Sequence, residues 1–144
     1  MFKNIVIPVD LSDKQSAQVV FPAALNFVNA FGSKIHLVHI MPDFGMKTVE
    51  DYLPRHWMSD QKERYKQLLE GMIKKFIPEG IEVECYIGRG AIYDQVINYS
   101  EKVEADLIII SAVRPQQRER DYMLGPNASK IVRHSSVSVL VVRD

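Results

Sequence analysis

The sequence predicts an α/β fold built on an open, five-stranded parallel sheet with four helices on its two faces. Five short apolar runs alternate along the chain with four segments of helical periodicity. Each helical segment spans about 10–20 residues, which suits a crossover that joins parallel strands and covers a face of the sheet. Right-handed crossovers leave few topologies for this order. The 144 residues suit a single domain, residues 1–144, and no internal repeat is visible.

The first strand and helix occupy residues 4–31. Residues 4–9 are almost wholly apolar and predict a buried strand. Ser12, followed three residues later by Gln15, offers a capping box with Ser12 as the N-cap. Apolar residues at helical spacing follow, and Pro22, which lies among them, should kink the helix.

The middle of the chain predicts a strand, a long connection and the clearest helix. Residues 34–40 predict the second strand, and residues 41–57 show no periodicity. Connections of this length are usually functional or mobile. The helix that follows has one apolar stripe, formed by Tyr65, Leu68, Leu69, Met72, Ile73 and Phe76.

The C-terminal half supplies three further strands. Residues 82–87 alternate polar and apolar side chains, with Val83, Cys85 and Ile87 inward, and this predicts a half-exposed edge strand. Residues 107–110 are fully apolar and predict a central strand. Residues 137–142 predict the last strand.

Composition excludes several classes of function. Eighteen basic side chains balance eighteen acidic ones, which argues against a nucleic-acid partner that needs a basic face. No apolar run approaches the roughly 20 residues needed to span a bilayer, and we expect no membrane partner. The single cysteine, Cys85, has no internal disulfide partner. Both features predict a cytoplasmic protein.

Ligands of open α/β sheets bind beyond the carboxyl ends of the strands, where the strand order reverses. Asp10 follows the first strand, and its carboxylate could accept from an adenine amino group or a ribose hydroxyl, or hold a metal. The alternative is that the charge only interacts favourably with the dipole of the next helix. Residues 125–128 open a short helix, with Pro126 suited to its first position, and a helix start of this kind suits phosphate. Taken alone, the segment favours an ordinary helix start.

Other common signatures are missing. The chain has no Walker A sequence, and Gly88 and Gly90 lack the third glycine of the dinucleotide fingerprint. His36 and His39 are three apart in a strand, so they point to opposite faces and cannot share a metal. We therefore expect no metal site and no catalytic residue set.

Three blocks of the sequence together resemble the universal stress protein family. They are residues 4–10 (NIVIPVD), residues 106–110 (DLIII) and a C-terminal block made of LG at 124–125, SKIVRH at 129–134 and VLVVR at 139–143. Nucleotide-binding members carry three spaced glycines with Ser or Thr after the last. Gly125 matches the third glycine, Ala112 and Pro115 (or Ser111, when aligned on the strand) stand at the others, and Pro126 replaces the Ser or Thr. SAVRP at 111–115 and YMLGPNA at 122–128 are similar to a small-protein branch of the family.

The resemblance implies a Rossmann-like, adenine nucleotide alpha hydrolase-like fold with strand order 3-2-1-4-5. It also implies a homodimer through the last strand, with Val137, Val139 and Val141 at the interface. The nucleotide-binding residues that it implies are Pro8, Val9, Asp10, Ser12, Val38, Ser111, Ala112, Arg114, Gly125, Pro126, Asn127, Ala128 and Val139.

Three functions follow as hypotheses. The first is a dimeric stress-response or regulatory protein that binds ATP or AMP, with Mg²⁺ if the ligand is a triphosphate. The second is a nucleotide-independent dimeric interaction module whose phosphate-binding motif is altered. The third is a slow ATPase or self-phosphorylating protein, for which the sequence places no general base besides Asp10.

Overall fold

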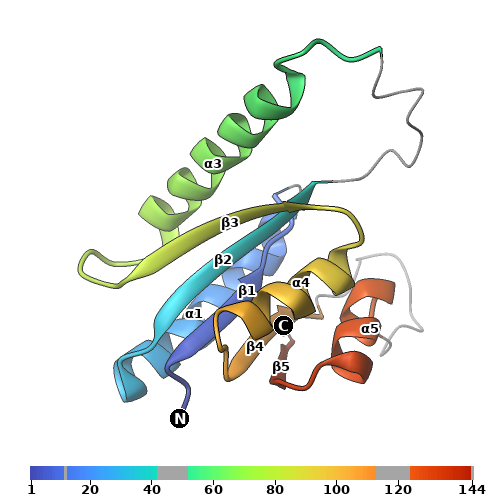
Figure 1. Cartoon of the computed structure of the whole chain (residues 1–144). Coiled ribbons are helices and arrows are strands. Elements are labelled where there is room, and N and C mark those ends of the chain that lie inside the picture. The colour runs from blue at the N-terminus through green and yellow to red at the C-terminus, as the bar shows by residue number, and fades with distance from the viewer. Residues whose placement is uncertain (12, 42–51, 113–123, 144) are drawn as a thin grey trace.

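A computed structural model describes residues 1–11, 13–41, 52–112 and 124–143 of the chain (Figure 1). Five strands alternate with the helices of this part of the chain. In chain order the elements are β1 (Asn4–Pro8), α1 (Lys14–Phe31), β2 (Lys34–Met41), α3 (Trp57–Phe76), β3 (Val83–Arg89), α4 (Ile92–Lys102), β4 (Leu107–Ser111), α5 (Pro126–His134) and β5 (Ser138–Val142).

The strands form one parallel sheet in the order β3-β2-β1-β4-β5, which confirms the predicted order. β1 lies at the centre, with Ile5 opposite Ile35 of β2 on one side and opposite Leu107 of β4 on the other. β3 and β5 are the two edges. The predicted edge strand at residues 82–87 is therefore confirmed in its position.

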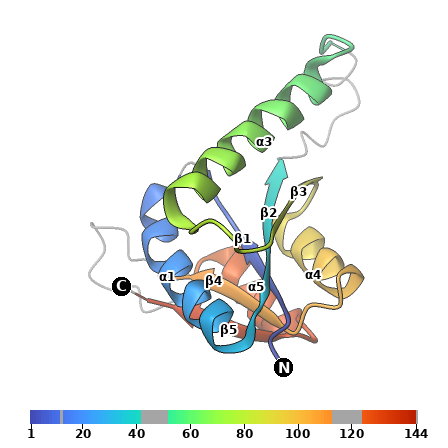
Figure 2. The same ribbon diagram turned by 90° about the vertical axis from the view of Figure 1, so that its left-hand side faces the viewer.

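Alternate side chains of the strands point to two separate cores, because successive residues of a strand face opposite sides of the sheet. Ile5, Ile35 and Ile109 pack with α1 and α3 in the first core. Val6 and Ile108 pack with α4 and α5 in the second. Figures 1 and 2 show α1 and α4 on opposite sides of the sheet. Both faces are covered, as an all-parallel sheet requires.

The start of α1 differs from the sequence prediction. The N-cap is Asp13, whose Oδ1 accepts hydrogen bonds from the backbone amides of Gln15 (3.1 Å) and Ser16 (3.2 Å). The predicted N-cap, Ser12, lies outside the described residues. An aspartate caps a helix as well as a serine does, so the capping-box pattern pointed one residue too early. Pro22 lies inside the continuous helix.

Two strands are longer than the sequence predicted. β2 runs to Met41, and β3 includes Gly88 and Arg89, which pair with Ile40 and Met41. A Cβ atom at Gly88 would lie 2.8 Å from Cδ1 of Ile40, so glycine allows this close approach at the end of the strand. Within the described residues, no helix is both long and apolar enough to cross a membrane.

Candidate functional site

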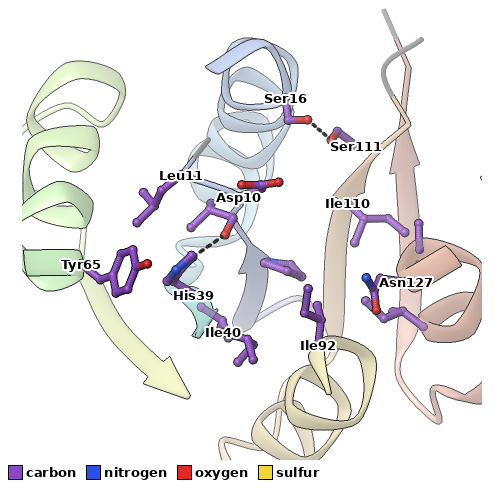
Figure 3. Close-up of a pocket in the computed structure, with 15 residues that line it drawn as sticks. Asp10, Leu11, Ser16, His39, Ile40, Tyr65, Ile92, Ile110, Ser111 and Asn127 are labelled. Atoms are coloured by element: carbon purple, nitrogen blue, oxygen red, sulfur yellow. Dashed lines mark hydrogen bonds between the residues drawn. The ribbon is translucent and has the colours of Figure 1, made fainter. Parts of the chain in front are cut away.

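A cavity of about 480 Å³ lies beyond the carboxyl ends of β1, β2 and β4 (Figure 3). Its volume falls within the range of about 300–1,000 Å³ that small-molecule sites occupy. β1 is flanked by β2 on one side and β4 on the other, so the cavity sits where the strand order reverses. The lining residues are Pro8, Val9, Asp10, Leu11, Ser16, Val38, His39, Ile40, Tyr65, Ile92, Ile110, Ser111, Asn127, Ala128 and Ile131.

Seven residues that the sequence suggested for nucleotide binding line this cavity together: Pro8, Val9, Asp10, Val38, Ser111, Asn127 and Ala128. They come from β1, β2, β4 and α5 and the segments next to these elements, which are far apart in the sequence. The fold therefore brings the central part of the suggested set to one place.

Four of the remaining suggested residues, Ala112, Gly125, Pro126 and Val139, are not among the lining residues. Ala112 donates its backbone amide to the carbonyl of Val142. Gly125 is the N-cap of α5, and Pro126 is the first residue of that helix. Val139 is half-buried in β5 against the second core. Ser12 and Arg114 lie outside the described residues.

Eight lining residues were missed by the sequence reasoning, namely Leu11, Ser16, His39, Ile40, Tyr65, Ile92, Ile110 and Ile131. His39 and Ile40 could have been found, because they close β2 and all strand ends meet at this edge of the sheet. Tyr65 and Ile92 lie on helices, and nothing in their sequence pattern separates them from other apolar helix positions.

The end of β2 offers backbone hydrogen-bonding groups to the cavity. The carbonyl of Val38 accepts from the amide of Val9 at 2.8 Å, and the pairing of β1 with β2 stops at Pro8 opposite Val38. Both backbone groups of a residue in a parallel strand point to the same side, and that side alternates along the strand. The amide and carbonyl of Ile40 therefore point to the β1 side, beyond the end of β1.

His39 joins this edge to the first core. Its Nδ1 lies 3.1 Å from the carbonyl oxygen of Val9. A carbonyl only accepts, so Nδ1 carries the proton and donates. The imidazole packs at 4.5 Å, centroid to centroid, on Tyr65 of α3. Within the described residues its Nε2 is buried without a hydrogen-bond partner.

The opposite wall of the cavity is the N-terminus of α5. No side chain caps this helix within the described residues, and its first internal hydrogen bond runs from the amide of Ser129 to the carbonyl of Gly125 at 2.9 Å. The amides of Asn127 and Ala128 precede that bond and have no carbonyl within the helix to bind. Pro126 has no amide hydrogen. Two backbone donors and a positive helix end therefore face this side of the site.

The side of the cavity that holds the carboxylate of Asp10 also carries hydroxyl groups. Ser111, the last residue of β4, donates from Oγ to Oγ of Ser16 at 2.7 Å. Ser16 in turn donates to Oδ2 of Asp13. Asp10, Ser16 and Ser111 all line the cavity, and Figure 3 shows the Ser111 and Ser16 side chains pointing toward one another. In the described part of the chain, no group of three His, Cys, Asp or Glu side chains could hold a metal ion.

The model of the universal stress protein family matches residues 1–143 of the chain. The chain belongs to this family. Universal stress protein G of Escherichia coli O157:H7 is 28% identical over 150 residues, which cover 99% of this chain and all of the relative. The resemblance suggested by the terminal blocks of the sequence is thus confirmed.

Solved structures share the fold of this universal stress protein. The protein described as hypothetical protein MJ0577 superposes with a TM-score of 0.81 at 22% identity, over all of this chain and 97% of the other. A universal stress protein from Archaeoglobus fulgidus, solved in complex with dAMP, has a TM-score of 0.66 at 20% identity, over 99% of each chain. These identities establish a common fold.

Proposed function

We propose that this universal stress protein binds an adenine nucleotide in the cavity beyond β1, β2 and β4. One observation carries the proposal: the polar lining is divided between the carboxylate of Asp10 on one side and the amides of Asn127 and Ala128 on the other. A nucleoside phosphate is divided in the complementary way, with hydroxyl donors on the sugar that suit the carboxylate and acceptor oxygens on the phosphate that suit the amides. The dAMP complex of the Archaeoglobus fulgidus relative supports an adenine nucleotide as the ligand.

The end of β2 suits the base. Adenine presents a donor and an acceptor side by side on its edge, and Ile40 directs one amide and one carbonyl to the side of the cavity. Pro8, Ile110 and the side chain of Ile40 supply apolar contact for the ring faces. Val38, which the sequence suggested for this role, lines the cavity but already accepts from Val9. We therefore assign base recognition to Ile40.

The sugar and phosphate follow from the remaining groups. The carboxylate of Asp10 accepts from a ribose hydroxyl, and the amides of Asn127 and Ala128 bind phosphate oxygens at the start of α5. Because Pro126 withholds one amide hydrogen, the grip on phosphate is weaker than at an ordinary helix start. A triphosphate would need Mg²⁺ to offset its charge.

The site favours binding over turnover. Asp10 is the only carboxylate among the described lining residues, and His39 directs its proton-bearing nitrogen to Val9 rather than to the cavity. General acid–base catalysis needs a side chain that can take up or release a proton within reach of the reacting atom. We therefore propose a regulatory, nucleotide-dependent role in stress response rather than rapid ATP hydrolysis.

The free edge of β5 supports a homodimer. The amide of Ala112 donates to the carbonyl of Val142, so alternate residues Ser138, Leu140 and Val142 direct their backbone groups to β4. Val139 and Val141 consequently direct theirs away from the sheet. Exposed groups of this kind pair with another strand, and we propose that they pair with β5 of a second copy.

Isothermal titration calorimetry with AMP, ADP and ATP, with and without Mg²⁺, tests the nucleotide proposal. We expect a micromolar dissociation constant, about −8 kcal/mol, for at least one nucleotide. Asp10→Ala should weaken that affinity at least about tenfold because it removes the sugar contact. Glu79→Ala, which alters an exposed carboxylate outside the cavity lining, is the matched control. Absence of binding by the unaltered protein would overturn the proposal.

A further inference from the structure

Asp13, Ser16 and Ser111 form a continuous hydrogen-bonded chain that reaches the cavity. The hydroxyl of Ser111 lies 2.7 Å from Oγ of Ser16, and Oγ of Ser16 binds Oδ2 of Asp13. The other carboxylate oxygen of Asp13 caps α1. This hydrogen-bonded chain therefore ties the end of β4 to the start of α1 at the cavity, which Ser16 and Ser111 line.

The direction of these hydrogen bonds is fixed. An ionised carboxylate has no hydrogen and only accepts, so Ser16 must donate to Asp13. A hydroxyl has one hydrogen, so Ser16 has none left for Ser111. Ser111 must therefore donate to Ser16, and its oxygen keeps only lone pairs for the cavity.

This direction makes one side of the cavity a set of acceptors. Asp10 and Ser111 both line it, and both offer only lone pairs to a ligand. The donors lie across the cavity at the start of α5, at Asn127 and Ala128. Figure 3 shows Asn127 apart from Ser16 and Ser111, on the α5 side of the site.

We propose that the Asp13–Ser16–Ser111 chain makes Ser111 a permanent hydrogen-bond acceptor that selects a sugar hydroxyl of the nucleotide and repels a phosphate oxygen. The inference rests on the proposed function and deepens it, because it sets the orientation of the ligand. A neutral hydrogen bond of this kind changes affinity about threefold to tenfold. Ser111 thus acts on specificity, while Asp13 and Ser16 are positioning residues that act through it.

Asp13→Asn reverses the direction of the hydrogen bonds from residue 13 through Ser16 to Ser111 without removing the N-cap of α1. An asparagine oxygen still accepts from the amides of Gln15 and Ser16, since Asn is as good an N-cap as Asp. Its amide nitrogen donates to Ser16, which then donates to Ser111. Ser111 becomes a donor to the cavity. Ser16→Ala is a second route to the same state, because it frees the Ser111 hydrogen.

Calorimetry with adenosine, 2′-deoxyadenosine, 3′-deoxyadenosine and AMP tests the proposal. Because Asp10 accepts from one sugar hydroxyl, Ser111 is expected to accept from the other, and the unaltered protein should prefer adenosine to the deoxynucleoside that lacks this second hydroxyl by about threefold to tenfold. Asp13→Asn and Ser16→Ala should lose that preference and raise the ratio of AMP to adenosine affinity. Ser111→Ala should lose the preference without raising the ratio. Equal preference in all four proteins would overturn the proposal while leaving the nucleotide site intact.

Inorganic phosphate provides a readout that needs no nucleoside. Phosphate binding is followed by the amide chemical shifts of Ser16 and Ser111. Phosphate should bind at least about threefold more tightly to Asp13→Asn and Ser16→Ala than to the unaltered protein or Ser111→Ala. If nucleosides fail to bind but phosphate shows this order, the proposed function fails and the role of the chain stands. The same phosphate affinity in all four proteins contradicts the proposed hydrogen-bond direction.

Discussion

The imidazole of His39 binds the carbonyl oxygen of Val9 at 3.1 Å, so the end of β2 holds the chain where it leaves β1. Val9 is followed directly by Asp10. Any ligand contact made by Asp10 therefore depends on the position of a backbone carbonyl that His39 fixes.

His39→Ala should lower both stability and nucleotide affinity. It removes a hydrogen bond from a half-buried site and leaves the Val9 carbonyl without its donor, which costs about 1–3 kcal/mol of unfolding free energy. Urea unfolding and calorimetry with AMP measure the two effects. Tyr65→Phe keeps the ring against His39 and is the control for stability, with little change expected in the unfolding free energy. Full affinity in His39→Ala would show that Asp10 is positioned without this bond.

Gly88→Ala should destabilise the protein at the border of the cavity. The added Cβ would lie 2.8 Å from Cδ1 of Ile40 and 2.9 Å from Cε1 of Tyr86. Overpacking of this kind costs about 1–3 kcal/mol, and displacement of Ile40 should also weaken nucleotide binding. Gly71→Ala is the control. Gly71 lies within α3, and nothing beyond its chain neighbours and the nearby helix backbone lies within 4 Å of the position of an added Cβ, so alanine should stabilise the helix by about 0.5–1 kcal/mol. Thermal melts of the two variants should move in opposite directions.

The free energy of unfolding should fall as the pH drops below the ordinary pKa of a histidine, about 6.5. His36 is buried, with Nδ1 3.2 Å from the Tyr99 hydroxyl and Nε2 3.4 Å from Oδ1 of Asn4. Burial lowers the pKa of His36 below 6.5. The charge of Glu84 opposes this shift, and the charge of Lys34 adds to it. Between the lowered value and 6.5 the unfolded chain binds more protons than the folded one, so the unfolding free energy rises with pH across that window.

His36→Gln should flatten the corresponding part of the pH profile of stability. Chemical unfolding at several pH values between 5 and 8, a range that brackets the ordinary histidine pKa, measures the slope. His134→Gln, at an exposed position at the end of α5, is the control for the loss of a histidine outside the core. A slope that survives in His36→Gln would assign the pH dependence to other groups.

Val139→Pro should convert the proposed dimer to a monomer. The backbone amide of Val139 points away from β4, so proline removes a hydrogen-bond donor from the free edge while sparing the ladder within the chain. Val139→Thr keeps the amide and is the control. Light scattering gives the mass of each, and circular dichroism confirms that the helices remain. A monomeric unaltered protein, or a dimeric proline variant, would contradict pairing through β5.

The sequence predicted the strands and helices well because their periodicities differ so clearly. Residues 107–110 are uniformly apolar since the strand is covered on both faces, and residues 82–87 alternate because an edge strand is only half covered. The strand order came from the family resemblance, since alternating elements alone leave several orders open.

The site was only partly predictable, for a physical reason. Asp10 and Ser111 stand at strand ends, which the topology brings to one edge. Tyr65 reaches the cavity because α3 packs against the end of β2 through His39, and Ser16 reaches it through the capped first turn of α1. Such positions depend on how helices pack on the sheet, and apolar spacing does not record that.

The two edges of the sheet differ in charge. Glu82 and Glu84 at β3 form ion pairs with Lys34 of β2 at 3.0 and 2.8 Å, whereas β5 is lined by valine and leucine. Charged side chains on an edge strand discourage the approach of another strand. If both edges were equally receptive, copies joined head to tail could grow into open filaments. With charged side chains at β3 and none in β5, the proposed association through β5 would close on itself after two copies.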